Sequence, residues 1–266
     1  MSLQMLRRAT LDLRMTVFWF GLGMAAYALL IVQFWPAMKA NSELLSQYIR
    51  SFPEALMKAF GVTDLSTFPG FLGAEYLNFM WPLIASVFVV TAGSAVVAQE
   101  IDRGTVELWL SVPERRWRLL VAKLVALFLG VVVIAAVTVV AIALGSPFAG
   151  ETPNPMALAA TGLVLAAYGV AVGGYCTLFS SFLSERSKAA GLGAAVTLAS
   201  YLASIISGLS KDVEDLKYFS LTTAFHPQQA LESGTPSWTE VGGLVGIGVV
   251  CVLAALVVFE RRDVAP

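Results

Sequence analysis

Six long apolar runs that contain no Asp, Glu, Lys or Arg constrain the fold of this chain more than any other feature. A helix needs about 20 residues to cross the hydrocarbon core of a bilayer, and it satisfies its own backbone hydrogen bonds there. We therefore expect an all-α integral membrane protein, with residues 1–266 forming a single transmembrane domain. The six predicted transmembrane helices are 15–35, 76–98, 124–148, 157–183, 189–209 and 241–259.

The composition agrees with a membrane protein and excludes an ordinary soluble domain. Charged residues make up 13% of the chain, against about 25% in soluble domains, and the mean hydropathy is +0.77. The absence of ionisable side chains from the runs argues against a proton relay or an ion pathway. Cys176 and Cys251 lie inside apolar runs, so we expect packing residues and not a disulfide or a metal site.

The lysines and arginines predict the orientation of the chain. If both termini and the 99–123 and 184–188 loops share one side, that side carries twelve of the 17 basic residues and the other side carries five. Basic residues are enriched in cytoplasmic loops, which predicts cytosolic termini. The twelve are Arg7, Arg8, Arg14, Arg103, Arg115, Arg116, Arg118, Lys123, Arg186, Lys188, Arg261 and Arg262, and the five are Lys39, Arg50, Lys58, Lys211 and Lys217.

Two segments outside the runs are predicted to form amphipathic helices. Leucines and arginines mix in residues 3–14, which favours a helix in the inner leaflet that leads into the first span; a frayed basic tail is the alternative. A cleaved signal peptide is not expected, because the first apolar run exceeds the about 7–15 residues of a signal sequence. Residues 42–61 have apolar positions at helical spacing around Pro53, which predicts two short extracellular helices.

Small residues four positions apart predict close contacts between helices in lipid. We expect these contacts to form within the chain, with a seam between two copies as the alternative. The pairs are Gly169–Gly173, Gly242–Gly246 and Gly191–Ala195.

The sequence contains no motif for catalysis. It lacks a phosphate-binding G-x-x-x-x-G-K-[ST] loop, a G-x-S-x-G nucleophile elbow and an H-E-x-x-H metal site. Ser180, Ser181 and Tyr175 lie in the fourth run without a base in that run, and the single histidine, His226, has no neighbouring metal ligands. We therefore predict that the chain alone is not an enzyme and binds no cofactor or metal.

One charged segment, residues 100–123, interrupts the apolar sequence between the second and third runs. The second span is expected to continue as a helix through Glu100 and to end at Gly104. Residues 105–112 then form a short helix, apolar on one side, which Pro113 ends. Such a helix suits a groove on a cytosolic partner; an ordinary interfacial loop is the alternative.

The residues of this segment resemble the signature of ABC-2 type permeases, the membrane subunits of ATP-binding-cassette exporters. That family commonly has Glu, then Gly-Thr-x-Glu-x-Leu, then Pro-x-x-Arg and a later Lys. The chain departs from the pattern at Ala122, a frequent glycine, and at 114–115, where Glu-Arg replaces Val-Ser. The resemblance also covers 53–61, 70–77 and 259–263. The matching residues are Glu100, Gly104, Thr105, Glu107, Leu110, Pro113, Arg116 and Lys123.

The resemblance implies a permease that works within a larger complex. Two permease subunits, identical or different, would form the pathway in a prokaryotic plasma membrane, in contact with lipid and without nucleic acid. Two separate ATPase subunits would bind ATP and Mg²⁺. The N-terminal helix would be the connecting helix, and residues 104–113 the cytosolic coupling helix between spans two and three. Glu100 and Glu107 would pair with basic residues of the ATPase or with Arg103 or Arg115 of this chain. The residues implied in ATPase coupling are Glu100, Gly104, Thr105, Val106, Glu107, Trp109, Leu110, Pro113 and Arg116.

The uncharged spans favour export of a hydrophobic or amphipathic cargo, such as a drug, a peptide or a lipid-like molecule. Two alternatives are a membrane scaffold or sensor that binds an ATPase without transport, and an intramembrane enzyme, which would need a polar catalytic pair inside the spans.

Overall fold

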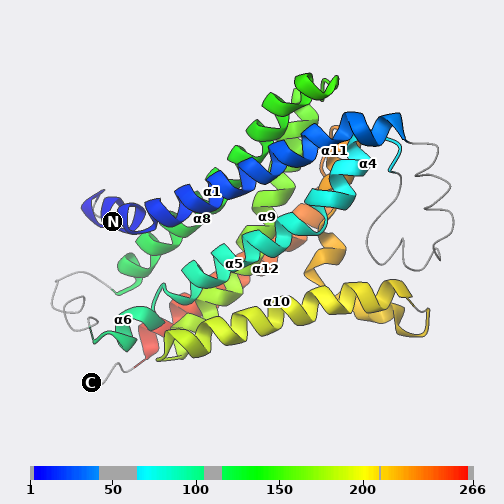
Figure 1. Ribbon diagram of the computed structural model, residues 1–266. Coiled ribbons are helices and arrows are strands. Elements are labelled where there is room, and N and C mark those ends of the chain that lie inside the picture. Colours follow the sequence, from blue (N-terminus) through cyan, green and yellow to red (C-terminus); the bar gives the residue numbers. More distant parts are fainter. Residues whose placement is uncertain (1–2, 42–64, 105–115, 210, 263–266) are drawn as a thin grey trace.

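The structure is a computed structural model that describes residues 3–41, 65–104, 116–209 and 211–262; within these ranges the chain is helical and has no strand. Six stretches are long and apolar enough to cross a membrane, which confirms the prediction from the apolar runs. Figure 1 shows them packed as a bundle. Their bounds are Gln4–Ala40, Phe68–Ser94, Trp117–Ala149, Pro155–Phe182, Arg186–Leu209 and Trp238–Arg261.

Five spans are formed mainly by one long helix each, and the second is composite. The long helices are α1 (Leu3–Ala40), α8 (Arg116–Gly145), α9 (Pro155–Phe182), α10 (Arg186–Leu209) and α12 (Trp238–Arg261). The second span joins α4 (Phe68–Leu72), a π-helical turn (Gly73–Leu77) and α5 (Met80–Ser94). Shorter elements are α6 (Ala98–Asp102), 3₁₀ turns at Ser146–Ala149, Lys211–Phe219 and Leu221–Ala224, and α11 (Pro227–Ser233).

Helix α9 lies at the centre of the bundle and contacts α5, α8, α10, α11 and α12. It begins at a strong start signal, because the Asn154 side chain accepts a hydrogen bond from the Met156 N–H and Pro155 occupies the first turn. About two thirds (67%) of the most apolar 18-residue stretch of α9 is buried, whereas the buried share of the corresponding stretch is 28% in α1 and 17% in α10. The outer helices therefore present their apolar faces to the surroundings, as spans in lipid do.

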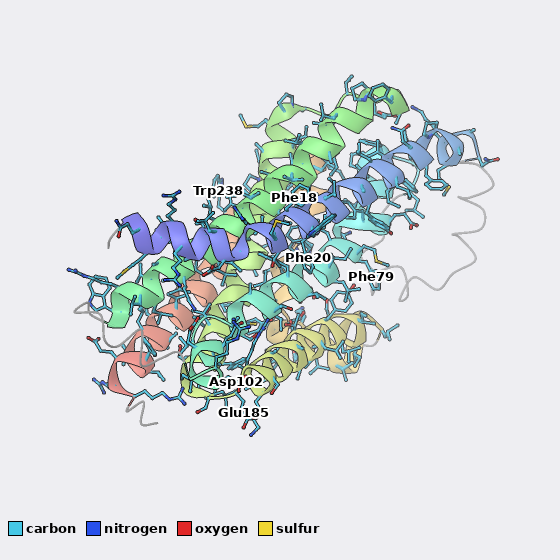
Figure 2. The ribbon with its side chains drawn as sticks, turned by 60° about the vertical axis from the view of Figure 1, so that its left-hand side comes forward. Phe18, Phe20, Phe79, Asp102, Glu185 and Trp238 are labelled. Carbon is cyan, nitrogen blue, oxygen red and sulfur yellow. The ribbon has the colours of Figure 1, made fainter. Side chains whose placement is uncertain are left out.

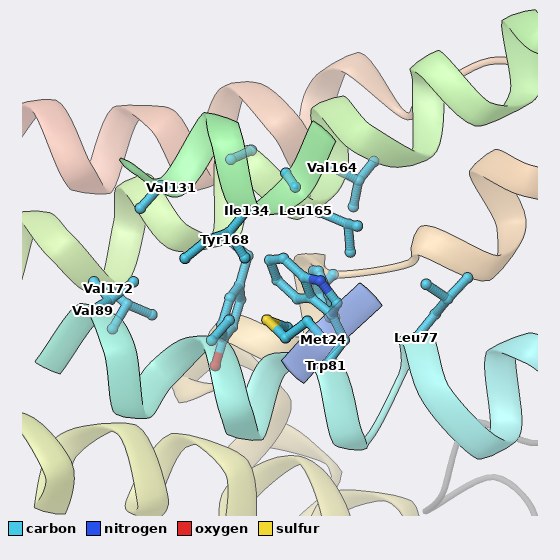
Figure 3. Close-up of a cluster of buried hydrophobic side chains, with 14 of the residues drawn as sticks. Met24, Leu77, Trp81, Val89, Val131, Ile134, Val164, Leu165, Tyr168 and Val172 are labelled. Carbon is cyan, nitrogen blue, oxygen red and sulfur yellow. The ribbon is translucent and has the colours of Figure 1, made fainter. Parts of the chain in front are cut away.

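The polar side chains of the core have partners. Trp81 stacks on Phe225, and its indole N–H donates to Thr138 Oγ1 at 3.1 Å. The Tyr168 hydroxyl lies 3.0 Å from Ser86 Oγ, and the Tyr168 ring packs on Phe225 at 4.7 Å between centroids. Figure 3 shows Trp81 and Tyr168 beside Met24 and Leu165 in this cluster. Buried hydroxyls that are hydrogen-bonded add specificity without the cost of an unpaired polar group.

Close helix contacts occur at only some of the predicted small residues. A Cβ on Gly169 would lie 2.4 Å from Val131 Cγ1, which confirms the contact within the chain. The expected contact within the chain was wrong for Gly191, Gly242 and Gly246, because a Cβ at each position meets no atom within 4 Å; the alternative of a seam between two copies stays a prediction there. Helix α12 turns a different face inward, and Gly248 approaches Gly174 so closely that a Cβ on Gly174 would lie 2.6 Å from Gly248 Cα.

The first helix reaches from one end of the bundle to the other. Residues 3–14, predicted as an amphipathic helix that leads into the first span, form the start of α1 and continue into the span without a break. At its far end, Trp35 Nε1 and Lys39 Nζ both donate to Glu151 Oε1, at 2.8 and 2.9 Å. These two hydrogen bonds lower the pKa of the Glu151 carboxyl, with Lys39 the larger influence. The extracellular helices predicted in 42–61 lie outside the described residues.

One end of the bundle gathers the segments that the basic residues had placed together. Figure 1 shows the N-terminus, α6, the start of α10 and the end of α12 at the same end. Asp102 on α6 and Glu185 before α10 also lie there (Figure 2). The predicted coupling segment lies between α6 and α8 in the sequence, and residues 105–115 of it are outside the described residues.

Candidate functional site

The structure describes the two ends of the predicted coupling segment. Glu100 lies on α6, Gly104 follows α6, and Arg116 is the first residue of α8. The side chain of Arg116 lies outside the described part of the structure. The remaining predicted residues lie outside the described ranges. They are Thr105, Val106, Glu107, Trp109, Leu110 and Pro113.

Gly104 ends the helical segment, as the sequence predicted. Its φ of +66° lies in the left-handed region, which glycine adopts without the steric cost of a Cβ. Its N–H donates to the Ile101 carbonyl at 3.0 Å. This arrangement is typical of helix ends.

Glu100 forms an ion pair with Lys123 that joins α6 to α8. Lys123 Nζ donates to Glu100 Oε1 at 2.8 Å, and both side chains are less than one fifth exposed. A charge with so little water around it depends on its partner, so removal of either one costs about 2 kcal/mol. Lys123 is thus a partner of Glu100 in addition to those that the sequence predicts, which are Arg103, Arg115 or basic residues of the ATPase.

The helix of the second span does not run unbroken to Glu100, and that expectation was wrong. Helix α5 ends at Ser94, and α6 begins at Ala98 after a short turn. The cause is Ser180 on α9, whose hydroxyl lies inside the break. Ser180 Oγ accepts from the N–H groups of Val97 and Ala98 at 3.0 and 2.9 Å, and it donates to the Ser94 carbonyl at 2.8 Å.

The Ser180 hydroxyl is used to its full capacity. A hydroxyl has one donor and two acceptor lone pairs, and Ser180 is fully buried. It therefore replaces the helical hydrogen bonds that the break removes and fixes the angle between α5 and α6. No feature of the sequence distinguishes Ser180 from its neighbour Ser181, so this role could not be predicted.

Arg262 holds the end of α12 against the loop between α9 and α10. Its guanidinium donates to the carbonyls of Ser181 and Leu183 at 2.9 and 3.2 Å and to Ser184 Oγ at 2.6 Å. Cations near the last carbonyls of a helix satisfy unpaired acceptors and favour the helix dipole. The C-terminal signature around Arg262 is thus tied to the same end as α6.

The other candidate residues have structural roles in the described part of the chain. Ser181 donates to the Thr177 carbonyl one turn earlier, and Tyr175 is hydrogen-bonded to Thr197. His226 Nδ1 lies 3.1 Å from Glu240 Oε1. Both cysteines are free thiols. Among the described residues, no cluster of three His, Cys, Asp or Glu side chains could hold a metal ion.

Two comparisons with known proteins complete the description. Residues 12–264 match a family model described as "ABC-2 family transporter protein". No curated protein matches the chain. The family model spans all six helical stretches and the charged segment between the second and third.

Proposed function

Because the chain belongs to the ABC-2 transporter family, we propose that it is the membrane-spanning subunit of an exporter driven by a separate ATPase. A pathway would form between two permease subunits, identical or different, in a prokaryotic plasma membrane. Two ATPase subunits would bind ATP and Mg²⁺ at the cytosolic end. Both termini of this chain lie on that side in the proposal, as the distribution of basic residues favours.

One observation carries the proposal: the Glu100–Lys123 pair ties together α6 and α8, the helices that flank residues 105–115 in the sequence. A force on that segment would reach α6 and the start of α8 together. The Ser180 hydroxyl continues the connection into the central helix α9. This is the kind of packed contact through which ATP binding can shift a membrane domain between two states.

The composition of the spans supports a hydrophobic or amphipathic cargo. The described buried polar residues are Ser, Thr and Gln rather than charged groups. An apolar wall with a few hydroxyls accommodates an apolar molecule and offers no site for a bare ion. We therefore propose export of a drug-like, peptide or lipid-like compound.

The test is co-expression of the chain with candidate ATPases, followed by affinity purification and reconstitution into proteoliposomes. We expect one ATPase to co-purify and ATP to drive movement of a fluorescent lipophilic cargo. Trp109→Ala should reduce both co-purification and transport, whereas Trp238→Ala, at the start of the last span, should leave co-purification unchanged.

Two results would contradict the proposal. If no ATPase co-purifies, the coupling role of residues 105–115 is wrong. If an ATPase binds but no member of a panel of lipophilic cargoes moves, the chain acts as a scaffold or sensor instead.

A further inference from the structure

A groove between α1 and α8 has no part in the proposed transport role. The two helices run side by side (Figure 1). The groove has a volume of about 480 Å³, within the range of about 300–1,000 Å³ that is usual for ligand sites. Apart from Thr10 and Arg14 at one end, its walls are apolar, with Phe18, Leu22, Leu129 and Val133 among them.

The groove opens toward the surroundings of the bundle and not toward its core. Phe18, Leu22 and Leu129 are each at least half exposed, although they line it. Figure 2 marks Phe18 on the outer surface of α1. In a membrane, such a groove faces the acyl chains of lipids.

The length of the groove matches one leaflet. On α8 the lining residues run from Ala126 to Val137, and eleven steps along a helix rise about 17 Å. Half of the hydrocarbon core is about 15 Å thick. The Arg14 charge lies toward the end of the groove where a headgroup would lie.

We propose that this groove binds one acyl chain of an anionic glycerophospholipid, with the phosphate at the Arg14 guanidinium. The apolar walls select a chain and not a polar ligand, and Arg14, the cation among the residues that line the groove, selects a negative headgroup. The site requires only that the chain spans a membrane and does not depend on export.

A substitution in the groove and a matched one outside it test the site. A Cβ on Gly21, which lines the groove, would meet only Val137 Cγ1 at 3.9 Å, so Gly21→Leu places a side chain in the groove. Gly23 lies two residues away on the same helix with no atom within 4 Å of a Cβ, and it does not line the groove. Gly23→Leu is therefore the control.

The probe is native mass spectrometry of the chain released from vesicles that contain phosphatidylcholine and phosphatidylglycerol in equal amounts. We expect the wild type and Gly23→Leu to retain phosphatidylglycerol, and Gly21→Leu to lose it. Arg14→Gln should lower the preference for phosphatidylglycerol over phosphatidylcholine about fivefold, whereas Arg8→Gln, outside the groove, should change it less.

Three results would overturn the site. The first is equal lipid retention by Gly21→Leu and Gly23→Leu, and the second is no preference for phosphatidylglycerol in the wild type. The third is that the wild type is a dimer which Gly21→Leu converts to a monomer, while the amount of retained lipid stays the same. If Gly21→Leu fails to fold, the comparison of Arg14→Gln with Arg8→Gln decides, because both arginines are exposed on the same helix.

Discussion

Replacing Ser180 with alanine would remove the one hydroxyl that satisfies three backbone groups at the break between α5 and α6. The N–H groups of Val97 and Ala98 would lose their acceptor, and the Ser94 carbonyl would lose a donor. These three residues are at most 2% exposed, so water does not replace the hydroxyl. Each unsatisfied buried group costs about 1–3 kcal/mol, which gives about 3–9 kcal/mol if nothing relaxes.

The chain can recover part of this cost by closing the break. In a regular helix the Val97 N–H would donate to the Gly93 carbonyl, and the Ala98 N–H to the Ser94 carbonyl. That change would rotate α6 and move Glu100 relative to Lys123. We therefore expect a net loss of about 2–4 kcal/mol in the free energy of unfolding, together with altered exchange of the amides in α6.

Ser181→Ala is the matched control, because Ser181 is equally buried on the same helix. Its hydroxyl donates to the Thr177 carbonyl, which lies one turn earlier in α9. The loss of such a bond should cost less than about 1 kcal/mol. The assay is thermal unfolding in detergent with hydrogen exchange measured by mass spectrometry over 94–102. Equal losses in the two variants, or unchanged exchange in Ser180→Ala, would refute the role of Ser180.

Three further predictions concern other contacts. Gly174→Ala should destabilise the protein by about 1–3 kcal/mol, because its Cβ would lie 2.6 Å from Gly248. Gly242→Ala, where a Cβ meets open space, should be neutral or stabilise the protein by up to about 1 kcal/mol. Thermal unfolding of the two variants checks this, and equal unfolding midpoints would contradict it. Glu100→Gln should lower transport per ATP hydrolysed and cost about 2 kcal/mol, while Asp102→Asn, exposed on the same helix, should change neither. The pKa of Glu151 is lowered in the folded state, so the contribution of Glu151 to the free energy of unfolding is full above the unfolded pKa and is lost as the pH falls through the folded pKa. Glu151→Gln should therefore reduce the loss of stability at acid pH. An unchanged dependence of stability on pH would argue against the contact with Lys39 and Trp35.

The six spans could be predicted because each is an uncharged run of sufficient length, and the structure places one long helix over five of them and a composite helical segment over the second. The run beginning at Tyr76 was incomplete, since α4 and the π-helical turn extend the second span back to Phe68. That turn lies against a residue far away in the sequence: a Cβ on Gly73 would lie 2.2 Å from Gln228 Oε1 of α11. A contact between residues so distant in sequence leaves no local pattern.

The ends of the candidate site were predictable to different degrees. Gly104 was recognised because glycine commonly ends a helix, and its positive φ agrees. The partner of Glu100 was missed, although Lys123 belongs to the same family signature; two oppositely charged positions in one motif were the available signal. The break at 95–97 left no signal, because its cause is a serine on another helix.

The most direct test of the central claim is ATP-dependent transport by Glu100→Lys, Lys123→Glu and the double variant, each reconstituted with the ATPase. If the pair joins the coupling segment to the bundle, each single variant should hydrolyse ATP but transport little cargo per ATP, and the double variant should recover a substantial part of the wild-type ratio. A wild-type ratio in both single variants would contradict the account, as would a double variant no better than the singles.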